Sequence, residues 1–391
     1  MGVRGPPGAH QPGRSRRGTF TSPLHSRRTA AILGVALAVA FGVCFLTGLI
    51  SHVIQQPPSW LSWPPRPAGL YRVTQGLHVS TGIATIPLLL AKLWAAYPGF
   101  WSWPPWRDLT HALERLSLVP LVAGSLFLLF SGVGNIAYWR PWGFFFTDAH
   151  YWAAWITIGA LLVHIGAKAS VTRLALSRAG RREDDAALAA HPGGLTRRGF
   201  LATTAAASGV LTVATVGQTF RPLRGVSVLA PRDPGVGPQG VPVNKSAAAA
   251  NVIQAATSPE YRFEVTGAVL EPRSFTLEQL RALPLHQARL PIACVEGWSS
   301  EATWRGVRVV DLLSEVGAED PDSATVRSLQ EGGLFGRSEL NRLFLRDPDT
   351  LLALELNGEP LHIDHGFPLR LIAPNRPGVL QTKWLATMEV R

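Results

Sequence analysis

Residues Ala30–Ile50 read AAILGVALAVAFGVCFLTGLI, a run of apolar and small residues without a charged side chain. A helix needs about 20 apolar residues to cross the hydrocarbon core of a bilayer. Backbone polar groups at that depth must be satisfied within the segment, which favours a helix. Similar runs follow at Val73–Trp94, Leu116–Ala137, Tyr151–Ala169 and, shorter and rich in Ala and Thr, Phe200–Val216. The sequence therefore predicts a membrane α-helical bundle of four helices plus a fifth anchor helix.

Charge is distributed unevenly along the 391 residues. Up to residue 257 there are 23 Lys and Arg against 7 Asp and Glu, whereas the remainder has 14 against 19. The basic residues flank the apolar runs, which is a topology signal in membrane proteins. The net charge of +11 therefore does not indicate nucleic-acid binding. High apolar content and only two Cys exclude a disordered chain, a disulfide scaffold and a four-Cys metal site.

The placement of Lys and Arg also predicts orientation. The N-terminal tail (residues 1–28) and the loop at residues 171–199 carry six Arg each, whereas the loops Ser51–Arg72 and Tyr138–His150 carry two and one. The positive-inside rule places the first two segments in the cytoplasm. Five spans then put everything after Phe220 on the extracytoplasmic side of the cytoplasmic membrane.

The start of the fifth run carries a second signal. Thr196-Arg197-Arg198-Gly199-Phe200-Leu201 resembles a twin-arginine export signal, a route that moves folded and often cofactor-loaded domains. The alternative is an ordinary cytoplasmic flank of a weak span. Since no small-residue cleavage site is apparent, we expect the segment to remain as an anchor.

Histidines inside the apolar runs are candidate haem ligands, because ionisable groups at membrane depth are costly and usually functional. His78 lies in the second run, His150 opens the fourth and His164 lies deeper in it. The last two are 14 residues apart, about four helical turns or 21 Å, as two haem levels in a four-helix bundle require. By depth His78 pairs with His150. Pairing of His78 with His164, or of His164 with His111, stays open.

Thr74–Gly82, together with His150 and His164, resembles a di-haem b-type cytochrome membrane domain. The resemblance implies haem b and electron exchange with quinone or quinol. Lys92 stands 14 residues after His78, where a helix with paired histidines would carry another His. One or two haems are therefore expected.

The C-terminal region has a different pattern. A Pro-, Gly- and Ala-rich stretch at residues 221–257 predicts an extended linker. Beyond it, short strands mixed with short helices predict an α+β domain. We expect strands at residues 261–267, 325–329, 352–356, 369–373 and 385–390, and helices at 274–283, capped by Ser274 or Thr276, and 309–316.

Residues 290–299 read LPIACVEGWS. Cys294 ends an apolar strand and opens a Gly-containing loop, where a thiolate can act as a nucleophile or as a soft-metal ligand. A nucleophile would need a positioned His base. His286, His362 and His365 are all open for that role.

Residues 241–391 resemble the sulfite oxidase family of molybdopterin enzymes. The resemblance rests on Cys-Val-Glu-Gly-Trp-Ser at 294–299, on His-Gly-Phe-Pro-Leu-Arg-Leu at 365–371, and on Gly378 with Gln-Thr-Lys-Trp at 381–384. It implies that Cys294 ligates molybdenum and is the catalytic residue. It also implies that the molybdopterin is bound by Asn244, Gln330, His365, Arg370, Gly378, Gln381, Thr382 and Lys383. A guanidinium and an ammonium suit the terminal phosphate of the pterin.

Soluble sulfite-oxidising members carry a C-terminal dimerisation domain, and this chain stops soon after Val390. In this respect it is more similar to the periplasmic methionine sulfoxide reductase branch, whose catalytic domain is served by a separate haem membrane subunit. The resemblance implies a fusion of both parts and oxygen-atom transfer on a small oxyanion or sulfoxide-like substrate. The alternative is a non-catalytic membrane haem electron-transfer or anchoring protein with a partner-binding outer domain.

The expected organisation has six parts. They are a cytoplasmic basic tail (1–28), a four-helix b-type cytochrome membrane domain (29–170), a cytoplasmic loop (171–199), a twin-arginine-like fifth span (200–220), an extended linker (221–257) and a sulfite oxidase-type molybdopterin-binding domain (258–391).

Overall fold

The structure is a computed structural model that describes residues 22–100, 108–139, 141, 143, 146–189, 195–333 and 335–391. Contacts within the chain group into two compact units. Unit 1 comprises the described residues of Met1–Val39, Thr85–Leu128 and Tyr151–Ser208, and unit 2 those of Ala40–Ala84, Leu129–His150 and Gly209–Arg391. Most of the basic tail expected at residues 1–28 lies outside the described residues.

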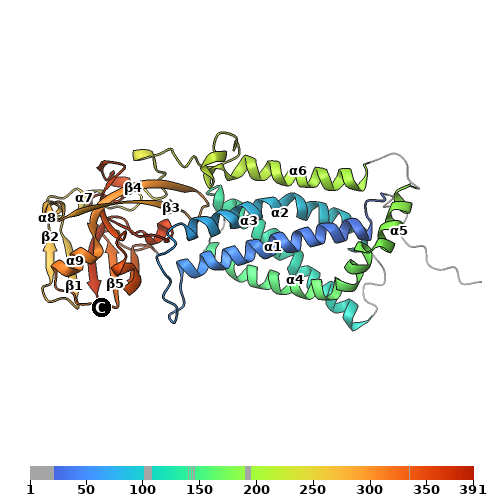
Figure 1. The fold of residues 1–391 in the computed structure, drawn as a ribbon, viewed down its shortest axis with the longest axis horizontal. Coiled ribbons are helices and arrows are strands. Elements are labelled where there is room, and N and C mark those ends of the chain that lie inside the picture. The colour runs from blue at the N-terminus through green and yellow to red at the C-terminus, as the bar shows by residue number, and fades with distance from the viewer. Residues whose placement is uncertain are drawn as a thin grey trace, which may run out of the picture. The chain divides into compact units, whose positions relative to one another are not determined.

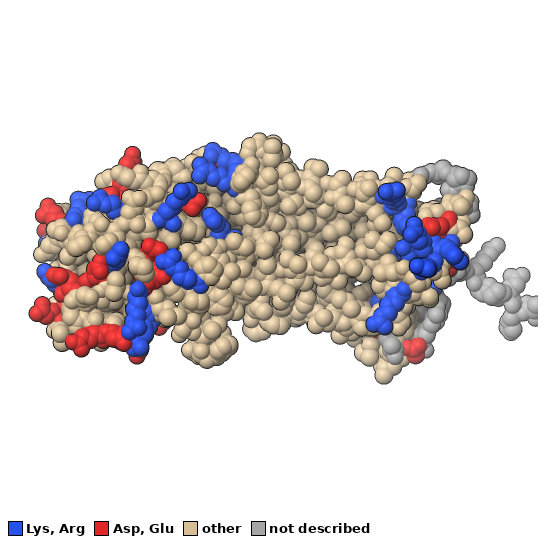
Figure 2. Space-filling model, in the orientation of Figure 1, with Lys and Arg blue, Asp and Glu red and all other residues tan. Residues whose placement is uncertain are grey.

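Helices make up most of the chain before residue 220 (Figure 1). They are α1 (Arg27–Gln55), α2 (Leu70–Phe100), α3 (Leu109–Ile136), α4 (Phe146–Leu176), α5 (Arg178–Ala189) and α6 (Arg197–Thr215). Among the described residues, five helices are long and apolar enough to cross a membrane by length and composition: α1, α2, most of α3, α4, and α6 continued to Gln218. Each predicted apolar run lies in one of them, to within one residue. Figure 2 shows a broad stretch of helical surface without charged residues, and basic side chains gathered over α5.

In unit 1, charged side chains join neighbouring helices. Lys92 of α2 donates to the carbonyl of Ala30 in α1 at 2.6 Å. Lys168 of α4 pairs with Glu114 of α3 at 2.5 Å. Cations removed from water need such partners, so these contacts link the helices in pairs.

Unit 2 contains two five-stranded sheets. The first has the order β2-β1-β10-β5-β6, in which β1 and β10 are parallel and the other neighbours antiparallel. The second has the order β3-β4-β7-β8, with β9 beside β7, all antiparallel. The strands are β1 (Phe263–Gly267), β2 (Arg273–Phe275), β3 (Leu285–Ala293), β4 (Ser299–Arg308), β5 (Ser323–Ser328), β6 (Arg337–Asn341), β7 (Leu351–Leu356), β8 (Glu359–Pro360), β9 (Arg370–Ile372) and β10 (Leu385–Val390).

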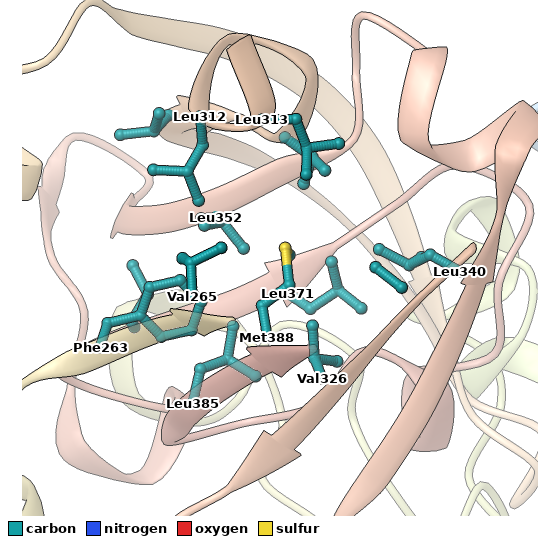
Figure 3. Close-up of a cluster of buried hydrophobic side chains, with 14 of the residues drawn as sticks. Phe263, Val265, Leu312, Leu313, Val326, Leu340, Leu352, Leu371, Leu385 and Met388 are labelled. Atoms are coloured by element: carbon teal, nitrogen blue, oxygen red, sulfur yellow. The ribbon is translucent and has the colours of Figure 1, made fainter. Parts of the chain in front are cut away.

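The main core draws side chains from both sheets (Figure 3). Val265 comes from β1, Leu352 from β7, Leu371 from β9 and Met388 from β10. Each fully buried side chain of this kind stabilises the fold by about 1.5–3 kcal/mol. A second buried cluster surrounds the end of β3 and includes Cys294. The strand that leads to this cysteine is therefore held firmly.

Three short helices accompany the sheets: α8 (Leu277–Ala282), α9 (Val309–Glu315) and α10 (Arg342–Arg346). Thr276 caps α8, because its hydroxyl accepts from Gln279 N at 3.0 Å while Gln279 Oε1 accepts from Thr276 N at 2.8 Å. Ser274, the other predicted cap, lies in β2. The predicted α8, α9 and five strands are confirmed to within a few residues.

The long strand β4 was not predicted. Its sequence SSEATWRGVR mixes polar, charged and aromatic residues, so it shows no simple alternation. Pairing with β3 along nine residues, and with β7 on its other edge, makes it a strand.

Residues 221–257, for which the sequence suggests an extended linker, contain short helical turns: η3 (Arg221–Leu223), η4 (Pro238–Gly240) and α7 (Ile253–Ala256). Val241 is fully buried in the cluster around Cys294. Ala247, Ala250 and Val252 are buried against Trp384. Much of this segment is therefore packed on the domain, because its small apolar side chains fit between larger ones.

Candidate functional site

Cys294 follows the last residue of β3, and the chain turns at once into β4. Cys294 N donates to Trp298 O at 2.9 Å, and Gly297 N donates to Cys294 O at 3.0 Å. Gly297 has a φ of 87°, in the left-handed region that favours glycine. The predicted position of Cys294, at a strand end before a Gly-containing loop, is confirmed. Its side chain is only 1% exposed.

The sulfur of Cys294 has an amide donor. Asn244 Nδ2 lies 2.7 Å from Sγ, and the indole N–H of Trp298 donates to Asn244 Oδ1 at 3.1 Å. An indole nitrogen only donates, so the amide oxygen must face Trp298 and the amide N–H₂ must face the sulfur. Asn244, which the resemblance places at the cofactor, therefore donates a hydrogen bond to the sulfur of Cys294.

The pKa of the Cys294 thiol is raised to about 12, first by burial and then by the nearby carboxylate of Glu296. Among the described residues, no hydrogen bond joins Cys294 to His286, His362 or His365. A thiol that keeps its proton is a poor free nucleophile. A metal cation can displace that proton and stabilise the thiolate. The surroundings of Cys294 therefore favour a role as a metal ligand over a role as a nucleophile, the two roles that the sequence leaves open.

Arg370 is a buried cation. Its side chain is at the start of β9 and 4% exposed, and its guanidinium NH1 donates to the carbonyl of His365 at 3.0 Å. Within the described residues its Nε has no hydrogen-bond partner. Burial alone lowers its pKa to about 9. A buried guanidinium without an ion pair calls for an anion from outside the chain.

Lys383 adds a second cation to this cluster. Its Nζ donates to two carbonyls, those of Lys245 at 2.5 Å and Asp364 at 2.9 Å. Burial, and then the charge of Arg370, lowers the pKa of Lys383 to about 7. The same two causes lower the pKa of His365 to about 4, so its ring is neutral at pH 7. His365 Nε2 donates to Pro238 O at 2.7 Å.

Gly366 explains how the two cations come so close. It has a φ of 110°, and a Cβ at this position would lie 3.1 Å from the Cβ atoms of both Arg370 and Lys383. Lys245, whose carbonyl receives Lys383, follows Asn244 in the chain. Contacts therefore run without a break from the sulfur of Cys294 to the pair of cations.

The other residues expected at the cofactor are less closely connected. Gly378 packs on β3 next to Cys294, since a Cβ there would lie 3.5 Å from Ala293 O. Gln381 is buried, donates to Arg376 O at 3.0 Å and leaves Oε1 without a partner among the described atoms. Thr382 and Gln330 bond elsewhere, to Ser338 Oγ and Gly332 O, both at 2.8 Å. No contact joins either of these two to Cys294 in the described part of the chain.

Sequence reasoning missed Arg376 and Glu296 as charged residues near the site. Arg376 is 7% exposed, and burial lowers its pKa to about 10. Glu296 is 3% exposed and pairs with Arg232 Nε at 3.3 Å. Glu296 lies within the motif that contains Cys294, but nothing in a sequence shows that its charge is buried.

His78 and His150 face each other in unit 2. Their ring centroids are 6.0 Å apart and the rings are inclined at 75°. His78 Nδ1 lies 2.8 Å from Cys44 O, and His150 Nδ1 lies 3.1 Å from Ser131 Oγ. A hydrogen bond at Nδ1 leaves the lone pair of Nε2 for a metal.

His78 and His150 are therefore the residues that would hold a haem iron, which would supply one-electron chemistry. Gly48 of α1 makes room for one ring, since a Cβ there would lie 2.7 Å from His78 Nδ1. The structure thus brings together the pair expected by depth.

His164 lies in unit 1, in a charged environment. Its charged neighbours are Lys92, Lys168 and Glu114, and its Nδ1 is buried without a hydrogen-bond partner among the described residues. It is not part of the His78–His150 pair. A role for His164 at a second haem stays a prediction.

The depressed pKa of Lys383 yields a prediction about stability. An unfolded lysine titrates near pH 10.4, so between about pH 7 and pH 10 the unfolded chain binds more protons, and stability rises with pH. Below pH 7 the full cost of the buried charge remains. Lys383→Met should therefore raise the Tm of the cofactor-free protein at pH 7 by about 3 °C.

Thermal unfolding of both proteins at pH 6, 7 and 9 measures this effect. The gain from the substitution should shrink towards pH 9. A lower Tm for the variant at every pH would contradict the assignment of Lys383 as a costly buried cation. The exposed Lys245→Met is the control, and its Tm should stay close to that of the wild type.

Comparison with known proteins identifies the C-terminal region. Residues 249–391 match the sequence model of the oxidoreductase molybdopterin binding domain family. The uncharacterized oxidoreductase YuiH of Bacillus subtilis is 32% identical over 127 residues, which cover 32% of this chain and 63% of that protein. The sulfite oxidase of Arabidopsis thaliana is 28% identical over 163 residues, covering 33% and 42%.

A further relative is described as a putative protein-methionine-sulfoxide reductase subunit, YedZ1, of Azospira oryzae. It is 32% identical over 130 residues, covering 33% of this chain and 48% of that protein. The chain spans less than two thirds of the length of each of these relatives. Residues 249–391 are therefore similar to the oxidoreductase molybdopterin binding domain family and, within it, to sulfite oxidases.

Proposed function

We propose that the chain is a membrane-anchored molybdopterin-dependent oxidoreductase. Its outer domain performs oxygen-atom transfer at a molybdenum centre bound by Cys294, on the extracytoplasmic side of the cytoplasmic membrane. His78 and His150 would hold b haem among its helices, and the haem would supply electron exchange with the quinone pool.

The observation that carries the proposal is the continuous set of contacts from Cys294 to the two buried cations. Asn244 contacts the sulfur of Cys294. Lys245 is the next residue after Asn244, and its carbonyl accepts from Lys383. Arg370 lies beside Lys383, with one guanidinium nitrogen unpartnered among the described atoms. A soft ligand at one end and an unsatisfied anion site at the other match a pterin cofactor that carries a metal and a phosphate.

The roles of the residues follow from this geometry. Molybdopterin supplies a redox-active metal and the chemistry of oxygen-atom transfer when bound. Cys294 would hold the metal as a thiolate, and Asn244 orients the sulfur through its amide. Arg370 and Lys383 would bind the phosphate, whose charge restores Lys383 to the protonated form. His365 is neutral and donates to Pro238 O, so Arg370 and Lys383 supply the positive charge at this position.

The relatives support the class of substrate. One is named a sulfite oxidase and another a putative protein-methionine-sulfoxide reductase subunit. Both names refer to sulfur–oxygen chemistry. We therefore propose a small oxyanion or a sulfoxide-like group as the substrate.

Cys294→Ser tests the metal site. A hydroxyl is a hard ligand and cannot replace a thiolate at molybdenum, so bound molybdenum should fall at least about tenfold and turnover should be lost. Metal analysis measures the molybdenum, and the absorbance of the haem reports whether the helices are intact. Cys44→Ser, which changes the other cysteine, is the matched control and should keep its molybdenum.

Wild-type molybdenum content in the Cys294→Ser variant would remove Cys294 from the site. A wild-type protein without molybdenum would instead favour a non-catalytic electron-transfer or anchoring protein. Metal analysis of the wild type therefore separates the two functions.

His78→Ala and His150→Ala test the haem. Each substitution removes one of the two imidazoles that would hold the haem, so both should abolish the same b-type absorbance in a dithionite-reduced spectrum. His52→Ala is a matched histidine control in α1 and should keep the spectrum. Molybdenum content should stay unchanged in all three variants.

The outcome for His164→Ala separates one haem from two. Loss of a different haem in this variant would show a second level. Retention of the full spectrum in His150→Ala would disprove the His78–His150 pair, and a wild-type protein without haem would leave the helices as an anchor.

Reporter fusions test the topology. A reporter that is active only in the cytoplasm should be silent after Arg391 and active after Ala189, because the fifth span alone lies between these two positions. Replacing Arg197 and Arg198 by Lys should impair export of the outer domain if the pair is an export signal. Lys keeps the charge for the ion pairs that Arg197 forms with Asp184 and Asp185. Normal export of the double variant would leave the two Arg as topology charges only.

A further inference from the structure

The backbone carbonyls of the turn after Cys294 accept hydrogen bonds from side chains that lie outside the turn. Three consecutive carbonyls point to donors on helical segments of unit 2. Val295 O accepts from Asn135 Nδ2 at 2.9 Å and from Gln75 Nε2 at 3.4 Å. Glu296 O accepts from Gln218 Nε2 at 3.1 Å, and Gly297 O from Thr219 Oγ1 at 2.5 Å.

These donors come from three separate parts of the chain. Gln75 belongs to α2, Asn135 to the last turn of α3, and Gln218 with Thr219 to the segment just after α6. Asn135 is 4% exposed and Gln218 is 1% exposed. These hydrogen bonds hold the side-chain amides and the turn carbonyls in place, because breaking one would leave a buried donor and a buried acceptor without a partner.

Close packing accompanies the hydrogen bonds. A Cβ at Gly297 would lie 3.1 Å from Val79 Cγ2 and 3.2 Å from Gln218 Nε2. Glycine at this position therefore lets the turn approach α2. Val79 is the neighbour of His78 in the chain, and Gln75 precedes His78 by three residues, about one helical turn on the same face.

We propose that the turn Cys294–Gly297 is the electron-transfer contact between the molybdenum site and the His78–His150 haem, and that Asn135 and Thr219 are positioning residues that hold it there. The inference rests on the proposed function, since it needs both centres. The path from the ligand sulfur passes through the turn and Gln75 to the helical turn that carries His78. Each step moves one electron, so that one centre is oxidised and the other is reduced, and no bond or proton changes at the contact.

Asn135→Leu tests the proposal in the full-length protein. Leucine keeps the branched shape of the side chain but removes the donor to Val295 O. Flash photoreduction with a flavin should reduce the haem, and the following reoxidation of the haem reports internal transfer to the molybdenum. We expect this rate to fall by roughly tenfold or more, since small displacements of a reacting contact have large effects on rate. The contents of haem and molybdenum should match those of the wild type.

Thr219→Val is a second, nearly isosteric variant that removes the donor to Gly297 O, and its rate should fall in the same direction. Gln55→Leu is the matched control. Gln55 donates to the hydroxyl of Tyr71 at 3.3 Å, and Tyr71 packs against Ala293. The change therefore removes an amide hydrogen bond close to Cys294 that involves none of the three turn carbonyls. Its rate should stay at the wild-type value.

Amide hydrogen exchange of residues 295–297 gives a readout that needs no bound cofactor. Exchange should rise in Asn135→Leu and Thr219→Val and stay unchanged in Gln55→Leu. A turn that exchanges faster without slower electron transfer would overturn the proposed route. Unchanged exchange in both variants would show that these donors do not hold the turn. A wild-type protein without haem or molybdenum would instead overturn the proposed function, while the exchange experiment would still report on the contact.

Discussion

The turn after β3 is constrained from two sides, and much of the site depends on it. On one side the sulfur of Cys294 accepts from Asn244 at 2.7 Å. On the other side the carbonyls of three successive residues accept from buried donors on helical segments. A tight turn cannot satisfy its own outward carbonyls. The helical donors therefore complete the hydrogen bonds of the segment that presents the candidate metal ligand.

Burying the charges of Arg370 and Lys383 lowers the stability of the folded domain. Arg370 and Lys383 lie close together, and burial lowers the pKa of both. Each cation is held in place by backbone carbonyls, and Arg370 forms no ion pair within the described residues. Such an arrangement is expected where an anionic ligand supplies the missing negative charge. Binding of the anion then offsets the free-energy cost of the two buried cations.

The two histidines of unit 2 follow a similar principle. Each ring is oriented through Nδ1, by a backbone carbonyl in one case and a hydroxyl in the other. A hydrogen bond at Nδ1 raises the basicity of the Nε2 atom and fixes the orientation of the imidazole ring. Gly48 provides the space for one ring. The helices therefore hold both imidazoles in fixed orientations.

The sequence by itself determined the apolar helices, most strands of the C-terminal domain and the position of Cys294 at a strand end. Length, hydropathy and alternation are local properties, and local properties decide local structure. The strand β4 and the packing of residues 241–256 were decided by tertiary structure, because their partners are distant in the chain. The same reason applies to the site. Motifs identified Cys294, Arg370 and Lys383 as candidates, but only the folded chain brings Asn244 to the sulfur, places His78 opposite His150 and buries Glu296. Burial and pairing depend on what the rest of the chain places around a residue, and no spacing along the sequence contains that information.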